Sequence, residues 1–331
     1  MSTEQQGRSG SGQQSPRRVA DGPGPRPPAG RDGLWETRTV EVPGAVLSVT
    51  GPTADASAGL PEALFVHGLG GSAENWTELM VELDGVVRGE ALDLPGFGWS
   101  APPLDGNLSV SGHVRAVIGY LEATGRGPVH LFGNSLGGAV AVRLAALRPD
   151  LVSSLVLVSP ALPELPPQRT ALPTGLLAVP GVPRLLQRVP AGGRSVEQAT
   201  DGLLDLVYGN ARAIPPERRE SAVAEYRRRM ALPYALQVLV GSARGIVSAY
   251  TERGDQALWR QAERVEVPVL LVYGLRDKLV SYRSAARACA AFRDARLLVL
   301  PESGHVAMME HPEQVARSAR EFLCEVLAAA E

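Results

Sequence analysis

The sequence predicts an α/β fold, because short apolar segments alternate with helical segments along most of the chain. The predicted strands are rich in valine and bounded by glycine or proline: 46–49, 63–66, 129–132, 155–158, 269–272 and 297–300. Helical patterns occupy 109–121, 136–147, 281–292 and 312–328. Strands that are apolar throughout are typical of a largely parallel sheet covered by helices on both faces.

The pattern divides the chain into three parts. Residues 1–33 contain almost no large apolar side chain, so a disordered tail is expected there. The α/β core is expected over 34–160 and 263–331. Between them, 161–262 breaks the alternation and is expected to form a helical cap, or lid. Its helical stretches are 196–208, 216–230 and 234–250.

Composition excludes several classes of function. The 331 residues carry a formal charge of −2, and the longest basic run is three arginines at 227–229, which we expect on a solvated helix face. A nucleic-acid partner is therefore not expected. No apolar run reaches the roughly 18 residues that cross a bilayer, so no membrane span is expected. The only cysteines, Cys289 and Cys324, lie in predicted helices near the C-terminus, which favours a reducing, cytoplasmic setting without a disulfide framework.

The strongest chemical signal is Gly-Asn-Ser-Leu-Gly-Gly at 133–138. It directly follows the predicted strand 129–132 and directly precedes an alanine-rich helix, which is the context of a nucleophile elbow. In such a turn the serine backbone is strained, and the glycines leave room where side chains would collide. Ser135 is therefore the candidate nucleophile, and the alternative is an ordinary helix N-cap serine.

A serine hydroxyl is a weak nucleophile at neutral pH, so a base must lie within hydrogen-bond reach. His305 is the candidate, because it follows the late strand 297–300 in a loop just before the last helix. The other four histidines, expected in core, turn or surface positions, are His67, His113, His130 and His311.

The histidine needs a carboxylate to orient it, and Asp277 follows the strand 269–272. His305 lies 28 positions after Asp277, which leaves room for one helix and one strand between them, so the two loops are expected to be neighbours. The chain order serine, aspartate, histidine is the order of α/β-hydrolases. Glu164, after the preceding strand, is the reserve candidate.

Attack on a carbonyl builds negative charge on its oxygen, so the site needs donors aimed at that oxygen. The amide of Leu136, next to the nucleophile, is one candidate. The second is the amide of Leu69, in a glycine-rich turn at 67–71 that His67 is expected to shape. These glycines lack the spacing of a phosphate-binding loop.

Together these motifs identify a resemblance to the α/β-hydrolase superfamily from about residue 36 to 328. The residues that carry it are 67–72 with Trp76, 93–100, 133–138, 274–277, and 304–305 with 310–312. The resemblance implies an eight-stranded, mostly parallel sheet with a helical cap over the active site. Haloalkane dehalogenases and epoxide hydrolases are similar but use an aspartate nucleophile, where this chain has Ser135.

The leading hypothesis is a serine hydrolase, similar to carboxylesterases, that forms an acyl-enzyme on Ser135 with a small to medium apolar substrate. It needs no cofactor and no metal. The segment 93–100 and Asn134 are also similar to hydrolases that cleave a carbon–carbon bond in ring-fission products, although those usually carry proline and glycine after the early turn. A third hypothesis is a non-catalytic ligand-binding protein. Leucines of the cap such as Leu203 and Leu206 are candidates to line an apolar roof.

Overall fold

A computed structural model describes residues 35–52, 59–164, 168, 179 and 195–330 of the chain. The expected tail at 1–33 and much of the first third of the expected cap lie outside these residues. The described strands form one eight-stranded sheet in the order β1-β2-β4-β3-β5-β6-β7-β8. Their bounds are β1 Trp35–Val42, β2 Ala45–Pro52, β3 Glu62–Val66, β4 Arg88–Leu92, β5 Val129–Asn134, β6 Val152–Val158, β7 Val269–Gly274 and β8 Ala295–Leu300.

The sheet confirms the α/β class and its mostly parallel pairing. Strands β4, β3, β5, β6, β7 and β8 pair in parallel, while β1 and β2 join them by antiparallel pairing. All six predicted strands lie within β2, β3 and β5 to β8. The carboxyl ends of β3, β5, β6, β7 and β8 therefore meet at one edge of the sheet, where ligands bind in open α/β sheets.

Two strands were missed because charged residues interrupt their apolar pattern. In β4, Glu90 is only 1% exposed, yet its carboxylate accepts hydrogen bonds from Arg38 at 2.6 Å and from Arg126 at 2.7 Å. The Tyr120 hydroxyl contacts the same carboxylate. These partners compensate the desolvation of a buried charge, so the strand tolerates it.

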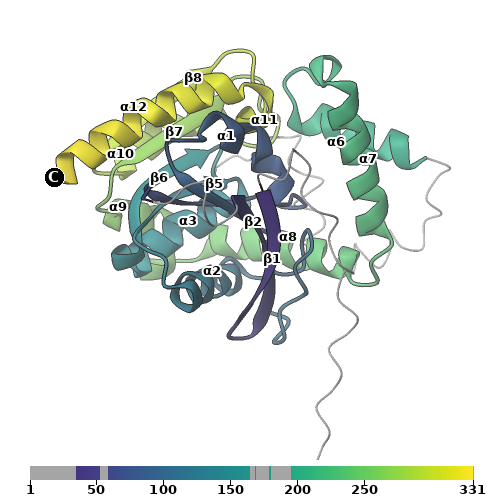
Figure 1. Ribbon diagram of the computed structural model, residues 1–331, viewed down its shortest axis with the longest axis horizontal. Coiled ribbons are helices and arrows are strands. Elements are labelled where there is room, and N and C mark those ends of the chain that lie inside the picture. Colours follow the sequence, from purple (N-terminus) through teal and green to yellow (C-terminus); the bar gives the residue numbers. More distant parts are fainter. Residues whose placement is uncertain (1–34, 53–58, 165–167, 169–178, 180–194, 331) are drawn as a thin grey trace, which may run out of the picture.

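Helices cover both faces of the sheet (Figure 1). One core cluster includes side chains of α2, α3, α9 and α10, and the other includes side chains of α1, α11 and α12. The bounds are α1 Thr77–Glu82, α2 Val110–Thr124, α3 Leu136–Leu147, α9 Leu258–Arg264, α10 Ala285–Ala291, α11 Ala307–Glu310 and α12 Pro312–Ala330. Short 3-10 turns are η1 Ala73–Trp76, η2 Pro149–Leu151, η4 Ala211–Ala213, η5 Gly254–Gln256 and η6 Tyr282–Ser284.

Three helices follow β6 in the chain and precede α9 and β7: α6 Val196–Val207, α7 Pro216–Met230 and α8 Ala235–Thr251. We call them the inserted helices. Ser195 begins α6 with a capping box, because its side chain accepts from the Gln198 amide and the Gln198 side chain accepts from the Ser195 amide. In Figure 1, α6 and α7 lie at the right of the view, beside the sheet.

Within the described part of the chain, no single helix is long and apolar enough to cross a bilayer, and α7 and α8 reach that length and composition only together, as a pair bent by 99°.

A buried arginine anchors α3, the helix that follows the predicted nucleophile. Arg143 is 1% exposed, and its guanidinium donates to Gln261 Oε1 at 2.9 Å, to Ser111 Oγ at 2.7 Å and to the Gln256 carbonyl at 2.9 Å. It also pairs with Glu252. These bonds hold α3 against α2 and the chain after α8, which fixes the helix on which Ser135 depends.

Candidate active site

Ser135 occupies the sharp turn between β5 and α3. Its φ of 52° and ψ of −113° lie in a region that non-glycine residues rarely adopt. The turn is held by backbone bonds, because the Ser135 amide donates to the Val158 carbonyl at 3.2 Å and its carbonyl accepts from the amides of Ala139 and Ala161. Ser135 is partly exposed, whereas Leu136 is fully buried. A strained, accessible serine at a helix N-terminus has the geometry of a nucleophile elbow.

The glycines around Ser135 are required by close backbone approach. A Cβ on Gly133 would lie 2.5 Å from the Gly137 carbonyl oxygen, and one on Gly138 would lie 2.7 Å from Pro160 Cβ. Neither position can hold a larger residue unless the strand and helix separate. The sequence-based reason for these glycines therefore agrees with the structure.

His305 and Asp277 form a buried hydrogen-bonded pair. His305 Nδ1 lies 2.9 Å from Asp277 Oδ2, and the two side chains are 5% and 0% exposed. Because the carboxylate oxygen can only accept, Nδ1 carries a proton and donates it, which leaves Nε2 as the ring nitrogen that can accept a proton. This is the tautomer that a general base needs.

The structure also explains why Asp277 is ionised. Its other oxygen, Oδ1, accepts from the amides of Leu279 at 2.7 Å and Val280 at 3.0 Å. Burial alone would raise the pKa of this carboxyl, but His305 and the two amides outweigh burial and hold the pKa below its usual value.

Glu164, the reserve candidate for the acid, has a different partner. Its Oε2 accepts from the Ser281 amide at 3.1 Å, and burial raises its pKa above the usual value. It therefore supports the loop that follows Asp277, while the hydrogen bond to His305 comes from Asp277 itself.

Asn134 joins the histidine loop to the nucleophile turn. Its Nδ2 donates to the His305 carbonyl at 3.0 Å and to the Val158 carbonyl at 3.0 Å. Since Asn134 directly precedes Ser135, this bond joins the backbone of His305 to the turn that carries Ser135. The sequence marked Asn134 only through a resemblance, because its bond to His305 joins residues 171 positions apart.

The glycine-rich turn after β3 lies against the nucleophile. A Cβ on Gly68 would lie 3.1 Å from Ser135 Cβ. His67 Nδ1 donates to the Gly68 carbonyl at 2.7 Å, and its Nε2 accepts from the Leu94 amide at 3.0 Å. Burial lowers the pKa of His67, so the ring stays neutral and keeps both bonds. His67 shapes the turn, as predicted.

The same turn carries one of the two predicted oxyanion donors. Leu69 is next to Gly68 and partly exposed, and the amide of Leu136 belongs to the first turn of α3, whose amides have no partner within the helix. Asp93 joins the segment after this turn to the loop after β4, because its Oδ1 accepts from the Ala73 amide at 2.7 Å and its Oδ2 from the Trp99 amide at 2.8 Å. Both candidate donors thus flank Ser135 in sequence or in space.

Two arginines of α7 contact the loops around the site, which corrects the expectation of a solvated face at 227–229. Arg229 donates to the Gly70 carbonyl. Arg228 donates to the Gly98 carbonyl at 2.8 Å, and its guanidinium lies 4.3 Å from the centre of the Trp99 ring. The prediction was wrong for these two residues because successive residues of a helix point in different directions. Adjacent arginines can therefore lie on different faces, one toward solvent and the others toward the loops.

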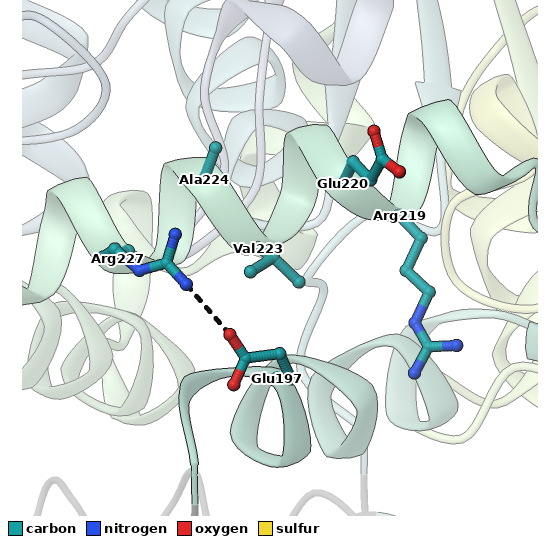
Figure 2. Close-up of a pocket in the computed structure, with 6 residues that line it drawn as sticks. All are labelled: Glu197, Arg219, Glu220, Val223, Ala224 and Arg227. Atoms are coloured by element: carbon teal, nitrogen blue, oxygen red, sulfur yellow. Dashed lines mark hydrogen bonds and ion pairs between the residues drawn. The ribbon is translucent and has the colours of Figure 1, made fainter.

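Arg227 alone behaves as predicted. Its side chain is 62% exposed and pairs with Glu197 of α6 at 2.9 Å, across the outer groove between α6 and α7 (Figure 2). Val223 lies in the same groove, which has a volume of about 370 Å³.

His130 is buried, and its Nδ1 lies 2.8 Å from Ser154 Oγ within the sheet, as expected of a core residue. Leu203 is 41% exposed on α6, so it does not line an enclosed roof. Over the described ranges, no cluster of three metal-ligating side chains is found, and both Cys289 and Cys324 are free thiols.

Comparison with known proteins places the chain in a family. The family model described as the alpha/beta hydrolase fold matches residues 64–312, which is most of the chain. The chain therefore belongs to the α/β hydrolase fold family.

Relatives within that family differ in activity. The chain is 30% identical to the 2-hydroxymuconate semialdehyde hydrolase of a Pseudomonas species, over 83% of this chain and 91% of that protein. It is 29% identical to an esterase of Mycobacterium tuberculosis, over 80% and 83% of the two chains. It is also 30% identical to the dihydrolipoyllysine-residue acetyltransferase component of an acetoin cleaving system of Pseudomonas putida, over 78% of this chain but only 62% of that protein.

Solved structures agree on the fold. The haloalkane dehalogenase of Bradyrhizobium elkani superposes with a TM-score of 0.74, covering 89% of this chain and 99% of that one. The two sequences are 23% identical, so the likeness supports the fold and not the reaction.

Proposed function

We propose that the protein is a serine hydrolase that cleaves an ester or related acyl bond through an acyl-enzyme on Ser135. The observation that carries this proposal is the hydrogen bond of 2.9 Å between His305 and Asp277, on loops beside the strained Ser135 turn. Many folds contain a glycine-flanked serine, but a buried His–Asp pair joined to it through Asn134 has few other uses.

In the first half of the reaction, His305 Nε2 takes the proton of the Ser135 hydroxyl as its oxygen attacks the carbonyl carbon. The amides of Leu69 and Leu136 stabilise the oxyanion, and His305 then gives its proton to the leaving alcohol. In the second half, water loses a proton to His305 Nε2 as its oxygen attacks the acyl carbon. The bond from the acyl carbon to the Ser135 oxygen then breaks, and His305 returns the proton to that oxygen, which releases the acid and restores the Ser135 hydroxyl. Asp277 stays ionised and balances the imidazolium.

We infer that the inserted helices, within the segment 161–262, act as a cap that supplies apolar contacts. Leu239 of α8 packs by the glycine-rich turn, where a Cβ on Gly70 would lie 3.6 Å from its Cδ1. Val238 packs on the other loop, where a Cβ on Gly96 would lie 2.6 Å from its Cγ2. Leu239 is therefore a better candidate than Leu203 for contact with an apolar substrate.

A second candidate function is cleavage of a carbon–carbon bond in a vinylogous diketone. It is favoured by the likeness to the 2-hydroxymuconate semialdehyde hydrolase, and it would use the same three residues. A non-catalytic ligand-binding role is the third candidate, and it predicts that Ser135 is unreactive.

A chain-length series separates these candidates. With nitrophenyl esters, we expect kcat/KM to rise roughly three- to four-fold per added carbon, because each buried methylene contributes about 0.8 kcal/mol, until the pocket is full. Leu239→Ala should lower this rise, and Leu203→Ala, at an exposed position, is the matched control. Rapid bleaching of a dienolate with negligible ester turnover would instead support the carbon–carbon hydrolase.

A further inference from the structure

The loop that carries His305 is attached directly to the inserted helices. The His305 amide donates to the Val207 carbonyl at 2.7 Å, at the end of α6. The backbones are in contact, because a Cβ on Gly209 would lie 2.7 Å from the Gly304 nitrogen, and one on Gly304 would lie 2.6 Å from the Val207 oxygen. Glycine at these two positions is thus explained by the close approach of two chain segments.

Glu310 bonds to both of these chain segments. Its Oε1 accepts from the Gly304 amide at 2.7 Å, and its Oε2 accepts from the Gly209 amide at 2.8 Å. Ser303 Oγ lies 3.4 Å from Oε1. One carboxylate therefore bridges an amide beside His305 and an amide of the inserted segment, and charge-assisted bonds of this kind are stronger than neutral ones.

Packing extends the same connection. Leu204 and Tyr208 of the α6 region are 9% and 5% exposed, and they belong to the core cluster that contains Val306 and Met308, just after His305. The end of α6 is therefore fixed to the histidine loop by apolar packing as well as by hydrogen bonds.

We propose that Glu310 is a positioning residue, which together with the Gly209 turn holds His305 in place for catalysis. The inserted helices then contribute to proton transfer by fixing the base, and not only by covering the substrate. This inference rests on the proposed function, in which His305 is the base.

Two variants test this proposal, one by changing the Glu310 carboxylate and the other by changing the Gly209 contact. Glu310→Gln keeps the size of the side chain but replaces one acceptor oxygen by an NH₂ group, which faces an amide donor. Gly209→Ala pushes a methyl group into the histidine loop without changing any charge. Matched controls are Glu313→Gln, at an exposed acid one turn further along the chain, and Gly202→Ala, where an added Cβ meets nothing within 4 Å.

We expect kcat on the best nitrophenyl ester to fall about a hundred-fold in both test variants, the scale of a misplacement of about 1 Å, with KM nearly unchanged. The far-downfield proton resonance of His305 Nδ1 should shift or broaden in both, and neither change should occur in the controls. Glu310→Gln carries the test alone if Gly209→Ala does not fold.

The proposal is overturned if both folded variants keep kcat within two-fold of the wild type, or if only KM or melting temperature changes. Failure of the proposed function is a separate result, because the wild-type protein would then neither hydrolyse esters nor react with a fluorophosphonate. The His305 resonance would still show whether Glu310 and Gly209 hold the histidine in place.

Discussion

His305 Nδ1 and Asp277 Oδ2 lie 2.9 Å apart, on loops that follow the neighbouring parallel strands β7 and β8. Parallel pairing places the carboxyl ends of both strands at one edge, so a short loop on each is enough to bring the two side chains together. The two amides that bond Asp277 Oδ1 fix the carboxylate before any substrate binds.

Asp277→Asn should therefore lower kcat by about ten-thousand-fold with the fold preserved, because an amide favours the wrong histidine tautomer and cannot balance the imidazolium. Glu164→Gln, which can still accept from the Ser281 amide, should change kcat only a few-fold. Steady-state kinetics of both variants checks the assignment. A large loss of kcat in Glu164→Gln, with kcat preserved in Asp277→Asn, would instead assign the role of the orienting carboxylate to Glu164.

Buried His113 should make stability depend on pH. The ring is fully buried, its Nε2 lies 3.1 Å from Ser242 Oγ of α8, and desolvation with a smaller effect of His67 lowers its pKa to about 3. The unfolded chain binds a proton near pH 6.5 but the folded chain does not, so stability is lost as pH falls below 6.5. Between pH 7 and pH 5 this loss is about 2 kcal/mol.

Urea unfolding of the wild type and of His113→Gln at both pH values measures this contribution. The decrease in the free energy of unfolding between pH 7 and pH 5 should be about 2 kcal/mol smaller in the variant, whatever its stability at pH 7. Equal decreases in the two proteins would show that His113 is protonated in the folded state.

Arg229 and Arg227 of α7 should contribute very different amounts to the free energy of unfolding. Arg229→Met removes a charged donor from the Gly70 carbonyl and should cost about 1.5–3 kcal/mol of stability. Arg227→Met removes only an exposed pair with Glu197 and should cost about 0–1 kcal/mol. Chemical denaturation of the two variants checks the difference. Equal losses would mean that the contact with Gly70 adds nothing.

The sequence was sufficient where local pattern decides the structure. The helices 136–147 and 216–230 were predicted with the observed bounds, because caps, prolines and periodicity are local signals. Strand β4 was missed, since the partners that make buried Glu90 tolerable, Arg38 and Arg126, lie far away in the chain.

The candidate site shows the same limit. Ser135, Asp277 and His305 were proposed from their order and their places after strands, and the structure places Asp277 within hydrogen-bond distance of His305. Glu310 was noticed only as part of a motif, because its role depends on Gly209, which is 101 positions away. No local pattern encodes such a contact.

The most direct test of the central claim is covalent labelling of Ser135 by a fluorophosphonate, located by peptide mass spectrometry. The account predicts stoichiometric labelling of Ser135 in the wild type and none in Ser135→Ala, whose kcat should fall on the order of a million-fold. Ser159 is the internal control, because it also has a positive φ, 45°, after a neighbouring strand but is fully buried. A folded wild-type protein that stays unlabelled, or labelling that persists in Ser135→Ala, would contradict the account.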